Sequence, residues 1–76
     1  MRSAYKVNEI KNKYLPGMRV CLLKMDDFQA PPVGTEGTIR GVDDIGSIMV
    51  AWDTGSSLNV VLDEDEVEIL SEGGIR

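Results

Sequence analysis

The sequence predicts a mainly β domain, a small β-barrel of about five short strands preceded by a short N-terminal α-helix. From Met18 onward, apolar residues recur at every second position, which is the period of a strand with one buried face. Glycine, proline and aspartate recur at short intervals, as in sheets built from turns and hairpins. The 76 residues suffice for one domain with a small core. We expect residues 3–14 to form the helix, residues 18–70 the barrel and residues 71–76 a flexible tail.

Residues 3–14 show helical periodicity. Three apolar side chains lie at spacings of three and four: Val7, Ile10 and Tyr14. Ser3 is a suitable N-cap, and Pro16 ends the helix because proline disfavours helical geometry at the residue before it. So narrow a stripe buries little area by itself. We therefore favour a helix that covers one open end of the domain over a docking or dimerisation helix.

The first strand is expected at "MRVCLL". Its alternation places Met18, Val20 and Leu22 on one face. Arg19, Cys21 and Leu23 share the opposite face. The following stretch, "KMDDFQAPPVGTEG", contains two adjacent prolines and two glycines, so it is predicted to be a long loop folded back by turns.

Two further strands, "GTIRGV" and "SIMVAW", are expected to be joined by a turn at "DDIG". In the second of them Ile48, Val50 and Trp52 point to one side, and Asp53 continues the other side. Because Trp52 shares its face with two β-branched residues, we expect the indole to fill the core and not to serve as a platform for a ligand.

The last third of the chain predicts a turn at "DTGS", a strand at "SLNVVL", a solvated acidic corner at "DEDE" and a short final strand at "VEIL". A short, twisted sheet tends to curl, and closure pairs the last strand with the first and hides both edges. The simplest architecture with this pattern is an SH3-like barrel, and an open OB-like sheet is the alternative.

Composition narrows the function classes. The chain lacks histidine and has one cysteine, which argues against His-based catalytic triads and thiolate metal clusters and suits a reducing cytoplasm. A core this small leaves little stability for a strained catalytic site, so we expect no enzyme activity and no cofactor. No segment resembles a membrane span. With a net charge of −5 and scattered bases, nucleic-acid binding would require convergence of a few cations, namely Arg19, Lys24 and Arg40.

Residues 14–62 resemble a known family. The runs "LPGMRVCLLKMDD" and "APPVGTEGTIRGVDDIGSIMVAWDTGSSL" are similar to a small family of bacterial and phage or plasmid-borne domains of unknown function. The "V-x-W-D-x-G" hairpin is also similar to that of SH3-like modules in ubiquitin-ligase and ribosome-associated proteins, which implies the barrel but no shared partner. The resemblance implies no activity or cofactor. The chain departs from the family pattern at "LDEDEVEIL", where it is more acidic.

The candidate contact residues lie in the long loop and in the "DDIG" turn. They are Met25, Asp26, Asp27, Phe28, Pro31, Pro32, Asp43 and Asp44. If the two loops lay side by side, the four aspartates could hold a cation such as Ca²⁺, but we favour independent turn caps because the spacing of a dedicated Ca²⁺ loop is missing. Phe28 could contact a peptide, but we favour Phe28 and the prolines as a cap on the core.

Together these features favour a non-enzymatic interaction or accessory module encoded on mobile elements, which binds an unidentified protein through residues 25–32 and 43–46. The alternative is a nucleic-acid-binding barrel of the ribosome-associated type, which the acidic total disfavours. A metal-dependent enzyme is the least favoured hypothesis.

Overall fold

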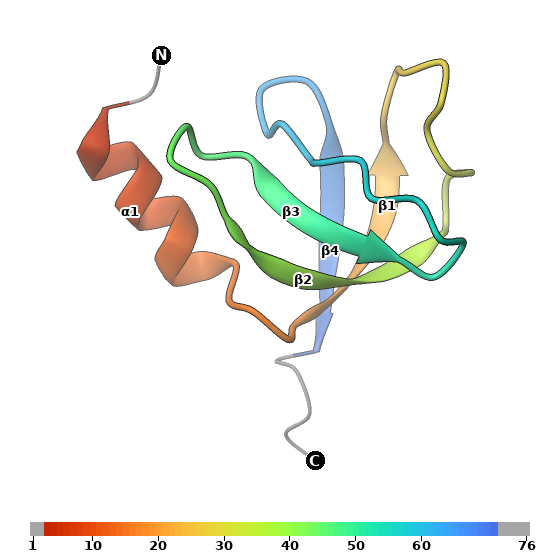
Figure 1. Cartoon of the computed structure of the whole chain (residues 1–76), viewed down its shortest axis with the longest axis horizontal. Coiled ribbons are helices and arrows are strands. Elements are labelled where there is room, and N and C mark those ends of the chain that lie inside the picture. The colour runs from red at the N-terminus through yellow and green to blue at the C-terminus, as the bar shows by residue number, and fades with distance from the viewer. Residues whose placement is uncertain (1–2, 72–76) are drawn as a thin grey trace.

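The computed structural model describes residues 3–71 as one helix and four strands (Figure 1). The elements are α1 (Ala4–Lys13), β1 (Arg19–Lys24), β2 (Glu36–Val42), β3 (Ile48–Trp52) and β4 (Glu66–Ser71). The predicted tail lies outside the described residues, except that Ser71 ends β4. In the described part of the chain, no helix is long and apolar enough to cross a membrane.

The predicted helix is confirmed to within one residue at each end. The Ser3 hydroxyl accepts a hydrogen bond from the Lys6 backbone N–H at 3.2 Å, which caps the first turn. The chain leaves the helix at Tyr14, whose N–H still donates to the Ile10 carbonyl at 2.9 Å. The apolar stripe of Val7, Ile10 and Tyr14 is buried. This burial shows that α1 packs on its own domain, beside the end of β2.

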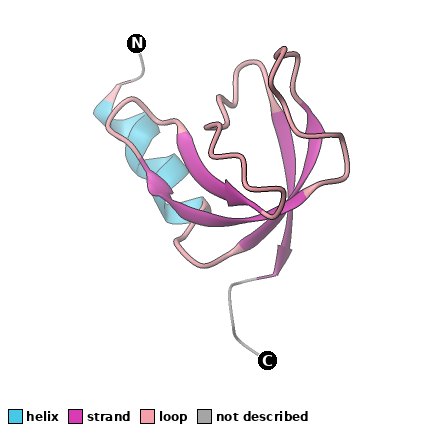
Figure 2. Ribbon diagram, turned by 45° about the vertical axis from the view of Figure 1, so that its right-hand side comes forward, coloured by secondary structure: helices cyan, strands magenta, loops and turns pink. Residues whose placement is uncertain are grey.

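The four strands form one antiparallel sheet in the order β3-β2-β1-β4 (Figure 2). The last strand pairs with the first, as the sequence predicts, and Cys21 lies opposite Glu68. The sheet is open, however, because β3 and β4 are its two edges and do not pair with each other. The expectation of a closed cylinder is therefore wrong.

The predicted strand at residues 57–62 is also absent, apart from a single bridge between Val60 and Ile48. On one side of Val60, a tight turn uses the Ser56 carbonyl to accept from the Trp52 N–H at 3.0 Å. On the other side, Val61 accepts from the N–H groups of Glu64 and Asp65 at 2.9 and 2.8 Å. Turns thus occupy the backbone on both sides of Val60, so only the single bridge to Ile48 forms in this segment.

The core lies on one face of the sheet. Its fully buried side chains are Leu22, Ile39, Ile48, Val20, Val50 and Val60. Trp52 is only 3% exposed, and its Nε1 donates to the Leu58 carbonyl at 2.9 Å. The prediction that Trp52 fills the core is confirmed.

The acidic corner differs from its prediction at one residue. Asp65 is buried, and its carboxylate accepts a hydrogen bond from the Val61 N–H at 2.9 Å. The side chain therefore closes the turn before β4. Because a charge run contains no signal for which member caps a turn, the sequence predicted a uniformly solvated corner.

Candidate functional site

The long loop between β1 and β2, residues 25–35, is held by backbone hydrogen bonds at its base and tip. At the base, Leu22 donates to the Thr35 carbonyl at 2.8 Å and accepts from the Gly34 N–H at 2.7 Å. At the tip, the Asp27 carboxylate accepts from the Gln29 N–H at 2.7 Å, and the Asp27 carbonyl accepts from Ala30 at 3.0 Å. We call this segment the β1–β2 loop. Its conformation is fixed by these turns.

Phe28 projects from the tip of the β1–β2 loop into solvent. Its relative exposure is 102%, so the side chain makes no burying contact among the described residues. On either side of it, Met25 packs against the core and Pro31 is buried, whereas Pro32 is exposed. The expectation that Phe28 caps the core is wrong, because the Asp27 turn directs Phe28 outward between two anchored residues. Of the proline pair, only Pro31 is buried.

Other apolar side chains are exposed near Phe28 in the sequence. Leu23, near the end of β1, is 45% exposed, and Val33, near the start of β2, is 69% exposed. Asp26 and Asp27, which directly precede Phe28, are exposed carboxylates. The β1–β2 loop thus presents an exposed aromatic side chain that directly follows two exposed carboxylates in the sequence.

The turn at residues 43–46 has a structural role. The Asp43 carboxylate accepts from the N–H of Ile45 at 3.1 Å and from the N–H of Ser47 at 2.8 Å. The preferred interpretation, a turn cap, is confirmed for Asp43. Asp44 is exposed, and the Ile45 side chain is 60% exposed at the tip.

The structure does not bring the two predicted contact segments together. The β1–β2 loop precedes β2, and the turn at residues 43–46 follows it, so the seven residues of β2 separate them. That length corresponds to about 20 Å of strand. Figure 1 shows the turn close to α1 and the β1–β2 loop at the other end of the molecule.

The four aspartates do not converge, so the structure gives no support to the disfavoured Ca²⁺ alternative. Asp26 and Asp27 lie at one end of β2, and Asp43 and Asp44 lie at the other. Within residues 3–71, no group of three or more His, Cys, Asp or Glu side chains is arranged to hold a metal ion.

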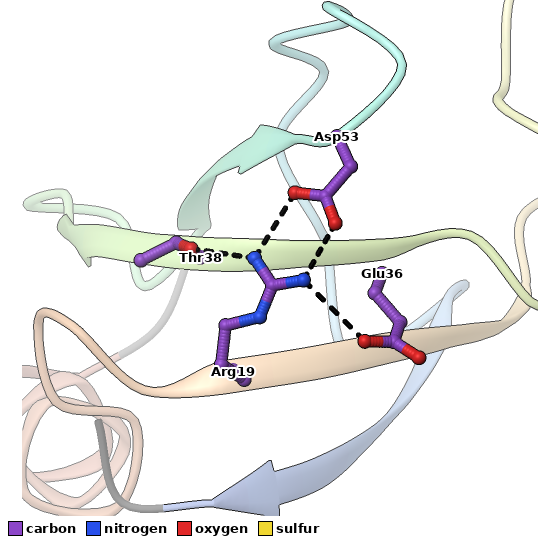
Figure 3. Close-up of polar contacts among 4 residues, drawn as sticks. All are labelled: Arg19, Glu36, Thr38 and Asp53. Atoms are coloured by element: carbon purple, nitrogen blue, oxygen red, sulfur yellow. Dashed lines mark hydrogen bonds and ion pairs between the residues drawn. The ribbon is translucent and has the colours of Figure 1, made fainter. Parts of the chain in front are cut away.

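A four-residue polar cluster lies on the outer face of the sheet (Figure 3). Arg19 of β1 donates to both carboxylate oxygens of Asp53, Nη1 to Oδ1 at 3.0 Å and Nη2 to Oδ2 at 2.5 Å. Nη1 also donates to the Thr38 hydroxyl at 2.8 Å, and Nη2 lies 3.4 Å from Glu36. Such two-pronged arginine–carboxylate contacts have fixed geometry. The cluster ties β1, β2 and the end of β3 together.

This cluster changes the acid–base behaviour of its members. The hydrogen bonds and positive charge of Arg19 hold the pKa of the Asp53 carboxyl below its usual value. The same hydrogen bonds from Arg19 to Asp53, with a smaller contribution from Glu36, raise the pKa of Arg19. The Asp53 backbone N–H also donates to the Glu36 carbonyl at 2.9 Å. Asp53 therefore stabilises the sheet through both side chain and backbone.

This ion pair is not predicted from the sequence, although strand alternation contains part of the signal for it. Strand alternation places Arg19 on the outer face of the first strand. It also places Asp53 on the outer face of its own hairpin, because Asp53 follows the inward-facing Trp52. The strand order was needed to make them neighbours: Arg19 lies opposite Thr38, and Thr38 lies opposite Ala51, two residues before Asp53.

The Arg19–Asp53 ion pair also bears on whether the basic residues form a cationic surface. Arg19 is occupied by Asp53 and Glu36, so it does not form a free cationic surface with Lys24 and Arg40. The bases are also less scattered than expected, because half of the eight lie at the start of the chain: Arg2, Lys6, Lys11 and Lys13. An open groove of about 540 Å³ runs beside α1, lined by Lys6, Glu9, Ile10, Asn12, Lys13, Tyr14 and Leu62.

Comparison with known proteins places these features in a family. No curated protein matches the chain. A family model described as a domain of unknown function, DUF4314, matches residues 3–70. The match extends beyond the residues that carry the resemblance in the sequence and includes α1 and nearly all of β4. The chain therefore belongs to the DUF4314 family.

Proposed function

We propose that this protein is a non-enzymatic protein-interaction module whose contact site is the β1–β2 loop, with Phe28 as the anchor. The observation that carries the proposal is the complete exposure of Phe28 on a loop whose backbone is fixed by hydrogen bonds. Burial of such a side chain contributes roughly 1.5–3 kcal/mol. Because Phe28 is fully exposed in the folded chain, the free energy of burying its side chain would be released only on binding to a partner.

The loop's hydrogen bonds favour binding. Ordering a flexible loop on association costs free energy, and a loop already held by its own turns avoids part of that cost. Interface hot spots are enriched in large side chains that enter a pocket on the partner and are surrounded by contacts that exclude water. Phe28 would be such a side chain, and Leu23 and Val33, which precede and follow it in the sequence, are further exposed apolar side chains on the two sides of the loop.

The charge around Phe28 indicates the kind of pocket that would receive it. Asp26 and Asp27 are exposed immediately before Phe28, and the chain as a whole carries a net charge of −5. We therefore propose that the partner offers an apolar pocket bordered by Lys or Arg side chains. Association should slow with added salt, because screening weakens the long-range attraction.

The architecture and setting of the module are also part of this proposal. The Val60 bridge continues the strand order beyond β3, which supports an SH3-like barrel whose fifth strand is reduced to one residue. The resemblance to bacterial and phage-borne domains supports an accessory role on mobile elements, and the free, half-buried Cys21 suits a reducing cytoplasm.

A capture experiment with matched variants tests the contact site. The wild type, Phe28→Ser and Ile45→Ser serve as baits in extract of the native host. Both substitutions remove an exposed apolar side chain, but at opposite ends of β2. We expect a partner that the wild type and Ile45→Ser retain and that Phe28→Ser loses. Measured with the purified partner, Phe28→Ser should raise the Kd at least tenfold. Equal affinity of all three baits would exclude Phe28 as the anchor.

Asp43 and Asp44 remain predicted contact residues, but they need a separate test. Asp44→Lys and Asp26→Lys cause the same change of charge at the two ends of β2. If the contact site is confined to the β1–β2 loop, only Asp26→Lys weakens binding to the partner. If Asp44→Lys weakens it equally, the contact surface extends along β2 to both ends.

Nucleic-acid binding is a second candidate, favoured by one observation. Three exposed lysines, Lys6, Lys11 and Lys13, lie on α1 beside a single acid, Glu9. A retardation assay over a salt series tests this candidate, with Lys11→Glu/Lys13→Glu as the variant and Lys24→Glu/Arg40→Glu as its charge-matched control. Binding that only the α1 variant loses would favour a nucleic-acid surface of the ribosome-associated type. No retardation at low salt would exclude it.

A further inference from the structure

At one edge of the sheet, two residues of β4 have backbone groups without hydrogen-bond partners in the part of the chain that the structure describes. In β1, Leu22 directs its N–H and carbonyl toward Thr35 and Gly34, and the Met18 carbonyl accepts from the Ile39 N–H. The even-numbered residues of β1 therefore face β2. Since backbone groups alternate in direction along a strand, Cys21 faces β4.

This alternation fixes the direction of the backbone groups in β4. Cys21 lies opposite Glu68 in a regular part of the ladder, between Val20 opposite Ile69 and Leu22 opposite Val67. Glu68 is therefore the residue whose N–H and carbonyl bond to β1. Val67 and Ile69 direct their N–H and carbonyl groups away from β1, toward the open edge, and these groups have no hydrogen-bond partner among the described residues.

The other edge of the sheet is partly covered. At β3, Ile48 exchanges two hydrogen bonds with Val60, at 2.9 and 2.8 Å, and the Trp52 N–H donates to the Ser56 carbonyl. The segment after β3 thus pairs with both ends of that strand. The edge at β4 has no such covering segment among the described residues, and an uncovered edge strand can pair with an additional strand.

We infer that β4 is a second interaction site, at which an extended basic segment of a partner protein adds to the sheet as a fifth strand. Its hydrogen bonds would be made by the outward N–H and carbonyl groups of Val67 and Ile69. This inference rests on the sheet edge and is independent of the site at Phe28.

The side chains of β4 specify the sequence pattern of the added strand. On the outer face, Glu66 and Glu68 are exposed, whereas Val67 and Ile69 are half-buried against the core. Side chains of an added strand alternate in the same way, so Lys or Arg would lie beside the glutamates and apolar residues would extend the core. The same charges oppose pairing with the β4 of a second copy, and the occupant is therefore a basic and apolar alternating segment.

Amide hydrogen exchange with a defined probe tests the inference. The probe is the acetylated and amidated hexapeptide Lys-Val-Lys-Val-Lys-Val, and the matched acidic peptide has Glu in place of Lys. In the free protein, the Glu68 amide should be protected, and the amides of Val67 and Ile69 should exchange rapidly. The basic peptide at millimolar concentration should protect Val67 and Ile69, and the acidic peptide should not.

Two pairs of variants identify the cause of any binding. Glu68→Lys should weaken the peptide about three- to tenfold, whereas Asp44→Lys, with the same change of charge, should not. Replacement of the Ile69 amide by an ester through semisynthesis removes an outward donor and should weaken the peptide by a similar factor while the protein stays folded. The same replacement at Glu68 removes a bond to β1 and should lower the melting temperature.

The outcomes separate this site from the one at Phe28. Phe28→Ser should leave peptide binding unchanged. The inference is overturned if neither Val67 nor Ile69 gains protection, if both peptides protect them equally, or if these amides are already protected in a dimer of the free protein. A loss of peptide binding in Phe28→Ser would likewise contradict a separate site on β4.

Discussion

Trp52 and Phe28 are large aromatic residues that the sequence assigned to the same place, the core, and the structure separates them completely. Trp52 is 3% exposed at the end of β3, and Phe28 is 102% exposed at the tip of the β1–β2 loop. In a strand, alternation determines which way each side chain points once one neighbour is known to be buried. In a loop, the direction depends on which local turn forms, and here it is the turn capped by Asp27.

The two sites also differ in how they are connected to the rest of the chain. Trp52 packs with Ile48 and Val50 and donates a hydrogen bond from Nε1 to the Leu58 carbonyl. Phe28 is not packed against any of residues 3–71, although the loop that carries it is anchored by Met25 and Pro31. The Trp52 region therefore stabilises the fold, whereas the Phe28 side chain adds no buried area to it and is the anchor of the proposed binding site.

The largest effect is expected at Trp52. Trp52→Ala leaves a cavity in the core and an unpaired Leu58 carbonyl, and it should lower the free energy of unfolding by roughly 3–5 kcal/mol. A domain of 76 residues has a total of about 4–11 kcal/mol, so much of the protein should be unfolded at 37 °C. Chemical denaturation followed by circular dichroism measures this. A loss below about 1 kcal/mol would mean that Trp52 is not a core residue in solution.

A smaller effect is expected where the backbone of β2 passes under Trp52. A Cβ atom at Gly37 would lie 2.7 Å from Val50 Cγ1 and 2.8 Å from Trp52 Cε3. Gly37→Ala should therefore cost about 1–3 kcal/mol through overpacking. In a double-mutant cycle with Val50→Ala, which removes one of the contacting methyl groups, the two losses should sum to more than the loss of the double variant. Strict additivity would contradict the close packing.

The turn at residues 43–46 separates a capping carboxylate from an exposed one. Asp43→Ala removes the acceptor for two backbone N–H groups and should cost about 1 kcal/mol. Asp44→Ala is its matched control and should change stability by less than about 0.5 kcal/mol. Thermal denaturation of both variants decides the point. Equal effects would show that the turn does not depend on the Asp43 cap.

The Arg19–Asp53 pair should appear as a dependence of stability on pH. The ion pair lowers the pKa of Asp53 in the folded protein, so its contribution is complete above the unfolded value of about 3.9 and is lost as the pH falls through the folded value. The wild type should have a higher melting temperature than Asp53→Asn at pH 6, and the difference should shrink below pH 4. A difference that does not change with pH would show that the carboxylate charge is not responsible.

The parts of the fold that the sequence predicted are those with a local signal. Ser3, Pro16 and the stripe of Val7, Ile10 and Tyr14 define α1, and alternation defines β1, β2 and β3. The strand at residues 57–62 was predicted wrongly because its alternation is genuine, yet turns on both sides of Val60 occupy the neighbouring backbone groups. Hydrophobic periodicity does not indicate whether the backbone around Val60 forms turns or a strand.

The candidate sites were less predictable for a related reason. The β1–β2 loop was identified from its composition, but the burial of Pro31 and the exposure of Phe28 depend on turns with no periodic signature. The open edge at β4 and the Arg19–Asp53 pair are properties of strand order. Because residues far apart in the sequence determine the strand order, neither the open edge nor the ion pair can be predicted before the arrangement of the strands is known.

The most direct test of the central claim, that Phe28 is held in water and is not part of the core, is the free energy of unfolding of Phe28→Ser beside the wild type in a urea titration. The two values should agree within about 0.5 kcal/mol, with equal slopes. A loss of about 2 kcal/mol or more would show that Phe28 is buried in solution and would remove the anchor of the proposed binding site.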